Sequence, residues 1–600
     1  MPEIYLPIIS SGPKPPPTGK RKVAIDPITR IEGHLRIEVQ VENGVVTDAW
    51  SAGTMFRGIE TVLTGRDPRE AWLYAQRICG VCTTVHSIAS VRAVENALNI
   101  TIPDNARIIR NLLEGSQFIQ DHVMHFYHLH ALDWVDIVSA LAADPTAASD
   151  LQKSISPNWD PAKSSPAYFS QVKTRLNNFV NSGQLGLFAN GYWGNAAYKL
   201  SREENLLAAA HYLEALLWQR EYIKFHAILG GKSPHPQTYL VGGMASPVDP
   251  TSPSAINNAQ VARLKQLSTD ALTFVTQVYI PDLLMVARKY KDWASLGGGR
   301  GHFLAYGDFP NDTSGAVSSL WMPQGIVVNQ DPGGAFMPQV QTLDQKQITE
   351  YVSRSWYTYA DGSAAKHPDL GETTPNYTGP TPPYDFLTTD GKYSWLKAPR
   401  YGDIPMEVGP LARMVVAYYS GGTSSAHARV KGLVDQVLGA LGVGPGALVS
   451  TLGRVAARGI ETQVIAEKMS GWLTDLENNI KNGNLTIHNG ARWSPQTWPA
   501  TAAGWGTTEA PRGGLGHWVH IQNGKIKNYQ CIVPTTWNGS PRDAGGQRGA
   551  WEQALIGTPM PDPNQPVELL RTIHSFDPCM GCAVHIVDSR GHAVTQVKVE

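Results

Sequence analysis

The chain has 600 residues, of which 42% are hydrophobic and 17% charged, and its formal net charge at pH 7 is -1. The length alone suggests several domains, and the apolar content is sufficient for a large buried core. A net charge near zero excludes an electrostatic attraction to nucleic acid or to an anionic membrane surface. The sequence contains no run of about 18 apolar residues, and therefore predicts no membrane-spanning helix.

The N-terminal third begins with a Pro-rich arm, residues 1–20, which lacks the basic segment and the apolar run of a signal peptide. The next stretch, "LRIEVQVENGVVTDAW", alternates apolar and polar residues around Asn43-Gly44, which predicts a β-hairpin. After it, "RDPREAWLYAQRICGVCTTVHSIASVRAVENAL" has the pattern of one helix with a CxxC motif in its middle.

The middle of the chain is mainly helical by its apolar periodicity. Ser201 and Glu204 have the spacing of a capping box at the start of one of these helices. Residues 292–410 are rich in Gly, Pro, Asp and Tyr, which predicts long ordered loops. The predicted helical stretches are 104–142, 201–230, 256–290 and 426–482.

Toward the C-terminus, "WVHIQNGKIKNYQCIVP" predicts a second hairpin that turns at Asn523-Gly524. The interior of the sequence contains no repeat, low-complexity tract or flexible linker, so we expect one domain over residues 21–585. The fold class predicted from these elements is α+β and predominantly helical, with a core of long bundled helices and peripheral β-hairpins.

Four of the five cysteines form two CxxC pairs near opposite ends of the chain. Cys79 and Cys82 lie in "RICGVCTTVH", and Cys579 and Cys582 lie in "DPCMGCAVH". Four thiolates that converge make a soft site suited to zinc, nickel or an iron-sulfur cluster. Structural zinc remains an alternative, although zinc ribbons close over about 15 to 20 residues. A thioredoxin-like redox pair is disfavoured because no βαβ pattern surrounds either motif.

These two motifs occur together with "DPITRIEGH", "GTMFRGIE", "EAPRGGLGHW" and "VPTTWN". In this combination the sequence resembles the large catalytic subunit of nickel-iron hydrogenases of the uptake, membrane-associated type, from about residue 22 to the end. The resemblance implies that family's fold and the reversible heterolytic oxidation of dihydrogen to protons and electrons. Gly581 departs from it, since many relatives have Ala there, and we expect this departure to be tolerated.

The resemblance also implies a nickel-iron centre held by the paired cysteines. Cys79, Cys82, Cys579 and Cys582 would hold nickel, and Cys82 and Cys582 would bridge it to an iron that carries cyanide and carbon monoxide. Cys579 is in addition a candidate first proton acceptor. Soft thiolates suit such a centre, because they bind nickel while leaving a coordination position open.

Several polar residues match catalytic groups of the family. Glu32 resembles the proton-relay glutamate, with a buried acid paired to an arginine as the alternative. Arg512 resembles the guanidinium over the open metal face, positioned by Asp121 and Asp577. Asp577 has a second interpretation as a turn or helix-cap residue. Thr535 matches a hydroxyl donor to a diatomic ligand of the iron, against an ordinary Thr at a strand end.

A second metal site, for magnesium, is implied by matches at Glu60, the main chain of Cys531, and His585. Oxygen ligands with one histidine are plausible for a hard cation. His86 lies four residues after Cys82, and we expect it on the same helix face, where it would orient the cluster from outside the ligand shell. A packed core histidine is the alternative for His86.

The remaining cysteine, Cys531, cannot bind an iron-sulfur cluster, which normally takes four cysteines, so electrons need a second protein to leave the site. We therefore expect an obligate heterodimer with an iron-sulfur small subunit. A membrane cytochrome b or quinone-reducing subunit is a further candidate partner. The family implies a location on the periplasmic side of the cell membrane, with export on the small subunit's signal.

The last residues, 586–600, form a predicted maturation peptide that a specific protease removes after His585 once nickel-insertion chaperones have acted. The alternating "HAVTQVKVE" predicts a strand that holds this segment open until cleavage. Two other functions stay open. A hydrogen-sensing relative is disfavoured because sensor forms lack such a tail, and a zinc-held structural protein would contain zinc and no diatomic ligands.

Overall fold

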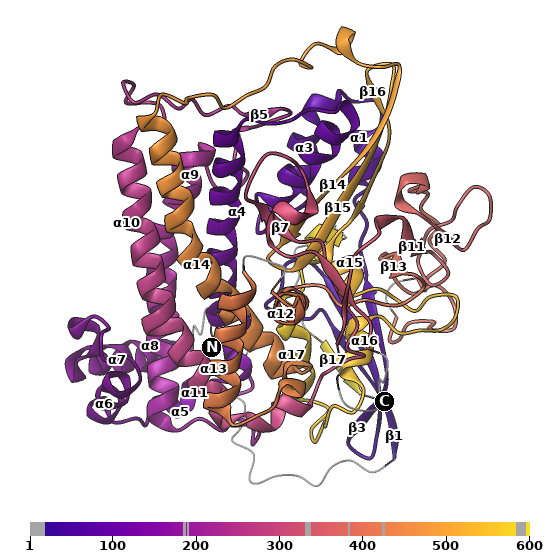
Figure 1. Cartoon of the computed structure of the whole chain (residues 1–600). Coiled ribbons are helices and arrows are strands. Elements are labelled where there is room, and N and C mark those ends of the chain that lie inside the picture. The colour runs from indigo at the N-terminus through magenta and orange to yellow at the C-terminus, as the bar shows by residue number, and fades with distance from the viewer. Residues whose placement is uncertain are drawn as a thin grey trace.

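The computed structural model describes residues 19–183, 188, 191–329, 336, 338–381, 384–422, 426–583 and 596–599, without the side chains of 582–583 and 596–599. Long helices lie side by side on one side of the molecule, and a long three-stranded sheet lies on the other (Figure 1). The α-helices are α1 (Ile59–Leu63), α2 (Ala71–Ala75), α3 (Val85–Leu98), α4 (Asp104–Met124), α5 (Ile137–Ala140), α6 (Pro145–Ile155), α7 (Pro166–Ser182), α8 (Arg202–Tyr222), α9 (Lys224–Gly230), α10 (Asn258–Phe274), α11 (Ile280–Lys289), α12 (Pro410–Tyr419), α13 (His427–Leu441), α14 (Thr451–Lys481), α15 (Pro534–Asn538), α16 (Ala550–Leu555), α17 (Val567–Ser575) and α18 (Met580–Ala583).

The helical side is organised around α14, which packs against α4 and α10. Gly115 lets α4 approach closely, because a Cβ there would lie only 2.8 Å from Met469 Sδ of α14. All four predicted helical stretches are mostly helical in the structure, with breaks before α5, at residues 134–136, and between α13 and α14. The capping box at Ser201 and Glu204 is formed at the start of α8.

The prediction of one helix around the first CxxC motif is wrong. The segment is divided into α2, a 3-10 turn at Gln76–Ile78, a loop and then α3. Cys79 has extended backbone angles, φ -147° and ψ 135°, which end the 3-10 turn. Both cysteines of the motif therefore lie in the loop before α3.

The strands form several small sheets. The first sheet has the order β17-β1-β2-β3, and another consists of β14, β15 and β16. The strands are β1 (Lys20–Asp26), β2 (Leu35–Glu42), β3 (Val45–Gly53), β4 (Tyr239–Leu240), β5 (Gly243–Met244), β6 (Phe303–Ala305), β7 (Asp308–Pro310), β8 (Leu320–Met322), β9 (Gly325–Val327), β10 (Val340–Gln341), β11 (Ile348–Tyr351), β12 (Ala365–Lys366), β13 (Ala398–Tyr401), β14 (Thr501–Ala510), β15 (Gly513–Gln522), β16 (Lys525–Ile532) and β17 (Gln596–Val599).

Both predicted hairpins are present, as β2–β3 and β15–β16. Their turn residues, Asn43-Gly44 and Asn523-Gly524, all have positive φ, as a type I′ turn requires. The hairpins are not peripheral, however, because β2 and β15 are buried over most of their length. The strand predicted near the C-terminus also forms, and β17 pairs antiparallel with β1. The stretch 292–410 consists mostly of loops with short strands, as expected.

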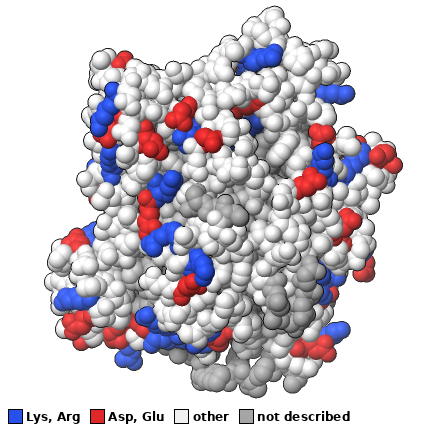
Figure 2. All heavy atoms as spheres, viewed as in Figure 1, with Lys and Arg blue, Asp and Glu red and all other residues white. Residues whose placement is uncertain are grey.

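One helical stretch in the described part of the chain, Asn258–Lys289, is long and apolar enough to cross a membrane by length and composition alone. It packs against α14 within the bundle, and 56% of its apolar window is buried. Burial of this kind is typical of a core helix, so the criterion is weak evidence for a membrane span. On the face drawn in Figure 2, positive and negative side chains are interspersed and no patch of one sign dominates.

Candidate metal centre

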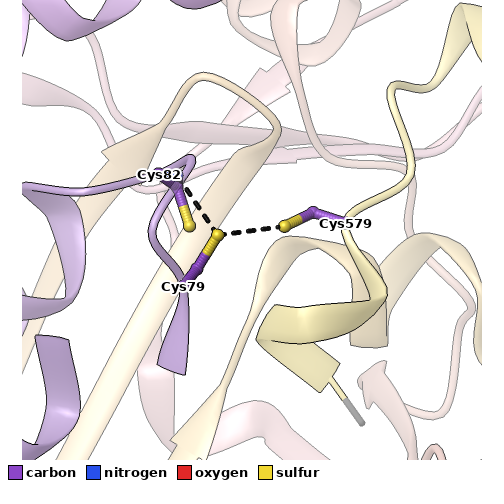
Figure 3. A group of neighbouring side chains, drawn as sticks. All are labelled: Cys79, Cys82 and Cys579. Atoms are coloured by element: carbon purple, nitrogen blue, oxygen red, sulfur yellow. Dashed lines mark hydrogen bonds between the residues drawn. The ribbon is translucent and has the colours of Figure 1, made fainter. Parts of the chain in front are cut away.

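Three cysteine thiols from the two ends of the chain meet in the interior (Figure 3). The Sγ atoms of Cys79 and Cys579 are 3.3 Å apart, although the residues are separated by 500 positions. Together with Cys82, they place three sulfurs within 4.8 Å of one another, and all three residues are buried. The side chain of Cys582 and the whole of His585 lie outside the described residues, so their roles stay predictions.

Main-chain contacts fix the segment that carries Cys579. Met580 donates its N–H to the carbonyl of Glu32 at 2.6 Å, and Cys579 donates its N–H to Thr535 Oγ1 at 3.1 Å. The C-terminal motif is thus held by the N-terminal region and by α15. This local structure explains how thiols from distant parts of the sequence are brought together without a zinc-ribbon fold.

The donor set fits a nickel-iron centre. Buried, convergent sulfur ligands favour soft metals such as nickel, iron or zinc over magnesium or calcium. A guanidinium, that of Arg512, lies close to the negative charge that thiolates would carry. Burial disfavours the Arg512 cation, but Asp577, Cys579 and Asp121 outweigh burial and raise its pKa well above the ordinary value.

Arg512 is held by the two acids that the sequence assigned to it. Its Nη1 donates to Asp121 Oδ2 at 3.2 Å and its Nη2 to Asp577 Oδ1 at 3.1 Å, and all three residues are buried. Burial raises the pKa of Asp121 to about 7, with Arg512 opposing the shift. Asp577 also follows the end of α17 with φ 56° and donates its N–H to His574 O. Asp577 therefore has the geometry of an acid that positions Arg512 and also that of a residue in the turn after a helix.

Glu32 lies beside Cys579 and, among the residues that the structure describes, forms no ion pair with an arginine. The Cys579 thiol donates to Glu32 Oε2 at 3.4 Å, and the N–H of Gly581 donates to the same oxygen. Burial, followed by the neighbouring Cys579, raises the pKa of Glu32 to about 8. A Cβ at Gly581 would lie 1.9 Å from Glu32 Oε1, so Ala could be tolerated here only if the Glu32 side chain moved.

The proposed magnesium residues Glu60 and Cys531 also lie together. Cys531 donates its N–H to Glu60 Oε1 at 2.8 Å. Both line a cavity of about 90 Å³ that extends to Gly581. Sequence reasoning missed Lys397 and Glu350, a buried pair at 3.5 Å, of which Lys397 also lines this cavity. The Gly- and Pro-rich composition around them gave no periodic signal.

His86 is on α3, and Cys82 is in the preceding loop, so the expectation of a shared helix face is wrong. The ring of His86 nevertheless lines a small pocket together with Cys82, Arg512 and Thr535. His517, which sequence reasoning missed, contacts His86 from β15. Nothing in the strand pattern of "GLGHWVHIQ" distinguishes this histidine from a packed core residue.

A buried cluster of three cysteines beside a carboxyl group of raised pKa and a fixed guanidinium is typical of a metal-dependent redox enzyme. Residues 57–585 match the nickel-dependent hydrogenase family, and residues 22–51 match a HoxL-like family. The chain is 50% identical to the uptake hydrogenase large subunit of Rhizobium leguminosarum bv. viciae, over 97% of this chain and 98% of the relative.

A second relative and a solved structure indicate the same family. The chain is 45% identical to the hydrogenase-1 large chain of Escherichia coli (strain K12), over 96% of this chain and 97% of the relative. The structure is similar to the Ni-Fe-Se hydrogenase from D. vulgaris Hildenborough, with TM-score 0.74, 35% identity and coverage of 94% and 100% of the two chains. The chain belongs to the nickel-dependent hydrogenase family, and the predicted large subunit of an uptake-type nickel-iron hydrogenase is confirmed.

Proposed function

We propose that Cys79, Cys82, Cys579 and Cys582 hold nickel, and that Cys82 and Cys582 also bind an iron with cyanide and carbon monoxide ligands. The observation that carries this proposal is the 3.3 Å approach of the Cys79 and Cys579 sulfurs within a buried cluster. A bound nickel-iron centre supplies an open metal position at which dihydrogen is split heterolytically. The core that extends from Leu63 to Tyr529 supports treating residues 21–585 as one catalytic domain.

Side chains of this protein then accept the proton from dihydrogen and stabilise the negative charge at the metals. The Cys579 sulfur passes its proton to Glu32 Oε2, the carboxylate oxygen that it already contacts. A carboxyl group with a pKa near the working pH both accepts and releases protons, which suits a relay. Arg512, kept in place by Asp121 and Asp577, stabilises negative charge at the metal face, and Thr535 offers a hydroxyl donor there.

We place magnesium at Glu60, the main chain of Cys531, and His585. The carboxylate of Glu60 and the cavity beside it support an oxygen-rich cation site. Removal of residues 586–600 after His585 by a maturation protease, following metal delivery by nickel-insertion chaperones, would leave this histidine at the new C-terminus. A terminal residue is free to enter the cavity, which a continuing chain would obstruct.

Electrons leave through a second protein. Hydrogenase large subunits pair with a small subunit, and we propose that this partner carries the iron-sulfur clusters because Cys531 is the one cysteine outside the CxxC motifs. A membrane cytochrome b or quinone-reducing subunit would accept the electrons. The heterodimer would act at the periplasmic side of the cell membrane, exported on the small subunit's signal.

Metal analysis and infrared spectroscopy of the purified heterodimer test the metal assignment. We expect one nickel and one iron per large subunit, with cyanide and carbon monoxide bands. Cys79→Ser should lose nickel and hydrogen oxidation, because a harder oxygen ligand binds nickel poorly. Zinc in place of nickel, with no diatomic bands, would instead support the structural-protein alternative.

A further inference from the structure

Arg413 is a buried arginine of α12 that lies next to the turn carrying Arg512. It is 1% exposed, and its guanidinium makes five hydrogen bonds, which is the full number of N–H groups that a guanidinium has. Two of these bonds go to the main-chain carbonyls of Ala510, at 2.9 Å, and Pro511, at 3.0 Å. These are the two residues that precede Arg512. Arg413 therefore holds the main chain where it enters the turn between β14 and β15.

Two carboxylates keep the Arg413 guanidinium in this orientation. Glu461 of α14 accepts from Nε at 2.5 Å and from Nη2 at 2.7 Å, and Glu509 of β14 accepts from Nη1 at 2.7 Å. Burial disfavours the Arg413 cation, but these two acids outweigh burial and raise its pKa above the ordinary value. A planar guanidinium bound through two N–H groups by one carboxylate has little freedom to rotate. The direction of its remaining donors toward the two carbonyls is therefore fixed.

The same network reaches the helix turn that carries one of the acids bound to Arg512. Burial is outweighed by Arg413 and His122, which lower the pKa of Glu461 to about 2, so Glu461 is a carboxylate. A carboxylate only accepts, so His122 Nε2 donates to Glu461 Oε2, at 2.7 Å. His122 follows Asp121 on α4, and Asp121 accepts from Arg512. Arg413 is thus connected both to the main chain before Arg512 and to the α4 turn that binds its guanidinium.

We propose that Arg413 is a positioning residue that fixes Arg512 at the metal face by holding the two carbonyls before it. A long side chain is placed accurately only if its main chain is fixed as well as its head group. All five donors of Arg413 are engaged within the protein, so it acts through Arg512 and not on the reacting atoms. Its effect on turnover rests on the proposed metal centre, where Arg512 stabilises negative charge.

The alternative is an ion pair that only stabilises the fold, and Arg110 provides the comparison. It donates to both carboxylate oxygens of Glu95, at 2.9 and 2.7 Å, and to the carbonyls of Leu240 and Gly243, each at 3.0 Å. Arg110 is 2% exposed. Its environment is therefore of the same kind as that of Arg413, but its carbonyl partners belong to β4 and β5. Arg110→Lys is the matched control for Arg413→Lys.

Crystal structures of heterodimers with Arg413→Lys and with Arg110→Lys test the positioning directly. Lysine keeps the charge but has only three N–H donors, so it cannot bind both carbonyls and both carboxylates. In Arg413→Lys alone, we expect Arg512 to move from its distances of 3.2 Å to Asp121 and 3.1 Å to Asp577. Unchanged distances in Arg413→Lys would overturn the proposal, whichever metals are bound.

Turnover normalised to bound nickel gives a second measurement. In Arg413→Lys, we expect kcat for hydrogen oxidation to fall about 10- to 100-fold, because a misplacement of about 1 Å can cost about 10²-fold. KM should change little, since Arg512 acts on charge that develops during the reaction. An equal loss of kcat in Arg110→Lys would show that Arg413 only stabilises the fold. A wild-type heterodimer without nickel would refute the proposed metal centre and leave the crystallographic result valid.

The double variant Arg413→Gln, Glu461→Gln addresses the case in which lysine prevents folding. It replaces the bidentate ion pair by two amides, so neither of the paired charges is left buried without its partner. The shorter glutamine side chain should not hold both carbonyls, and we expect the same displacement of Arg512. If neither Arg413 variant formed a folded heterodimer while Arg110→Lys did, Arg413 would be needed for the fold rather than for Arg512, and the proposal would fail.

Discussion

Glu32 and Gly581 share the space beside Cys579, and their arrangement determines how a proton can leave the cluster. The Glu32 carboxylate receives hydrogen bonds from Cys579 Sγ and from the Gly581 N–H. It lies where the Cβ of any other residue at 581 would be. A carboxylate placed by a main-chain donor has little rotational freedom, which favours proton transfer along one path.

Glu32→Gln removes the proton acceptor while nearly preserving its shape. We expect the infrared bands and metal content to remain, and both hydrogen-deuterium exchange and hydrogen oxidation to fall by about 10²- to 10⁴-fold, the usual contribution of a positioned acid-base group. Normal exchange in this variant would show that protons leave by another route, and Glu32 would then be a structural acid.

Gly581→Ala tests the placement of Glu32 without changing its chemistry. The added methyl group would force the carboxylate away from the Gly581 N–H, because 1.9 Å is far below a van der Waals contact. We expect metal content to be retained and turnover to fall. Gly471→Ala in α14 is the control, since a Cβ there meets nothing within 4 Å, and full activity in both variants would contradict the role of Gly581.

A pH effect is expected at a buried histidine of α9, His226. Burial lowers the pKa of His226 to about 4, below the value of about 6.5 in the unfolded chain. Between these values the unfolded state binds the proton first, so this histidine reduces stability as the pH falls through that window. His226→Gln lacks this contribution, and its Tm should decrease less between about pH 7 and about pH 5 than that of the parent protein.

Above about pH 8 the imidazole is neutral in both the folded and the unfolded state. The Tm difference between His226→Gln and the parent protein should therefore not change with pH in that range. Equal pH dependence of Tm in His226→Gln and the parent would show that the imidazole is protonated in the folded state.

At the scale of elements, α3 and β14 approach each other with almost no space between them. A Cβ at Gly504 or Gly506 would lie 2.3 Å from a main-chain nitrogen of α3. These two glycines are on the same face of the strand, because side chains alternate along it. They let β14 lie directly against the helix that carries His86, and this contact sets the distance between α3 and the neighbouring β15.

Gly506→Ala should therefore separate α3 from β14. Overpacking of this kind costs about 1 to 3 kcal/mol, so we expect a lower Tm and, since α3 carries His86, altered infrared bands. Ala503→Val adds more volume on the opposite, exposed face of β14 and should change neither quantity. A stable Gly506→Ala variant with unchanged spectra would show that the two elements can separate without consequence.

The same elements show what the sequence could and could not predict. Hairpins with Asn-Gly turns are specified locally, since both turn residues need positive φ, and both were predicted. Strand β14 was not predicted, because Gly504 and Gly506 are poor strand formers. Glycine is needed at these positions because helix α3 lies directly against the strand. The helix predicted through the first CxxC motif failed for a related reason, as tertiary contacts of the cysteines override the local pattern.

For the site, the paired cysteines were predictable because few chemistries need two CxxC motifs at opposite ends of a chain. The Arg512 partners followed from the resemblance, and the distances of 3.2 and 3.1 Å agree with them. His517, Lys397 and Glu350 were not predictable. Each is an ordinary residue in its own segment and becomes important only through what folding brings beside it.

At the scale of the whole molecule, the full-length chain and a chain processed after His585 would place their C-termini differently. Strand β17 pairs with β1 from Val23↔Val599 to Asp26↔Gln596, which keeps the end of the chain in the N-terminal sheet. The cavity lined by Glu60 and Cys531 lies beside Gly581 instead. A chain that ends near residue 585 could place its terminus in that cavity, whereas the full-length chain pairs residues 596–599 with β1.

We therefore expect the active large subunit to end at His585. Intact-mass measurement of the purified, catalytically competent heterodimer should give a large subunit without residues 586–600, while a strain without the nickel supply should accumulate the full-length form. The physical reason is that cysteines from both ends of the chain must close around the metals, and the terminus can enter the cavity only after the β17 segment is released. A competent subunit that still ends at Glu600 would contradict the processing and, with it, the assignment of His585 to magnesium.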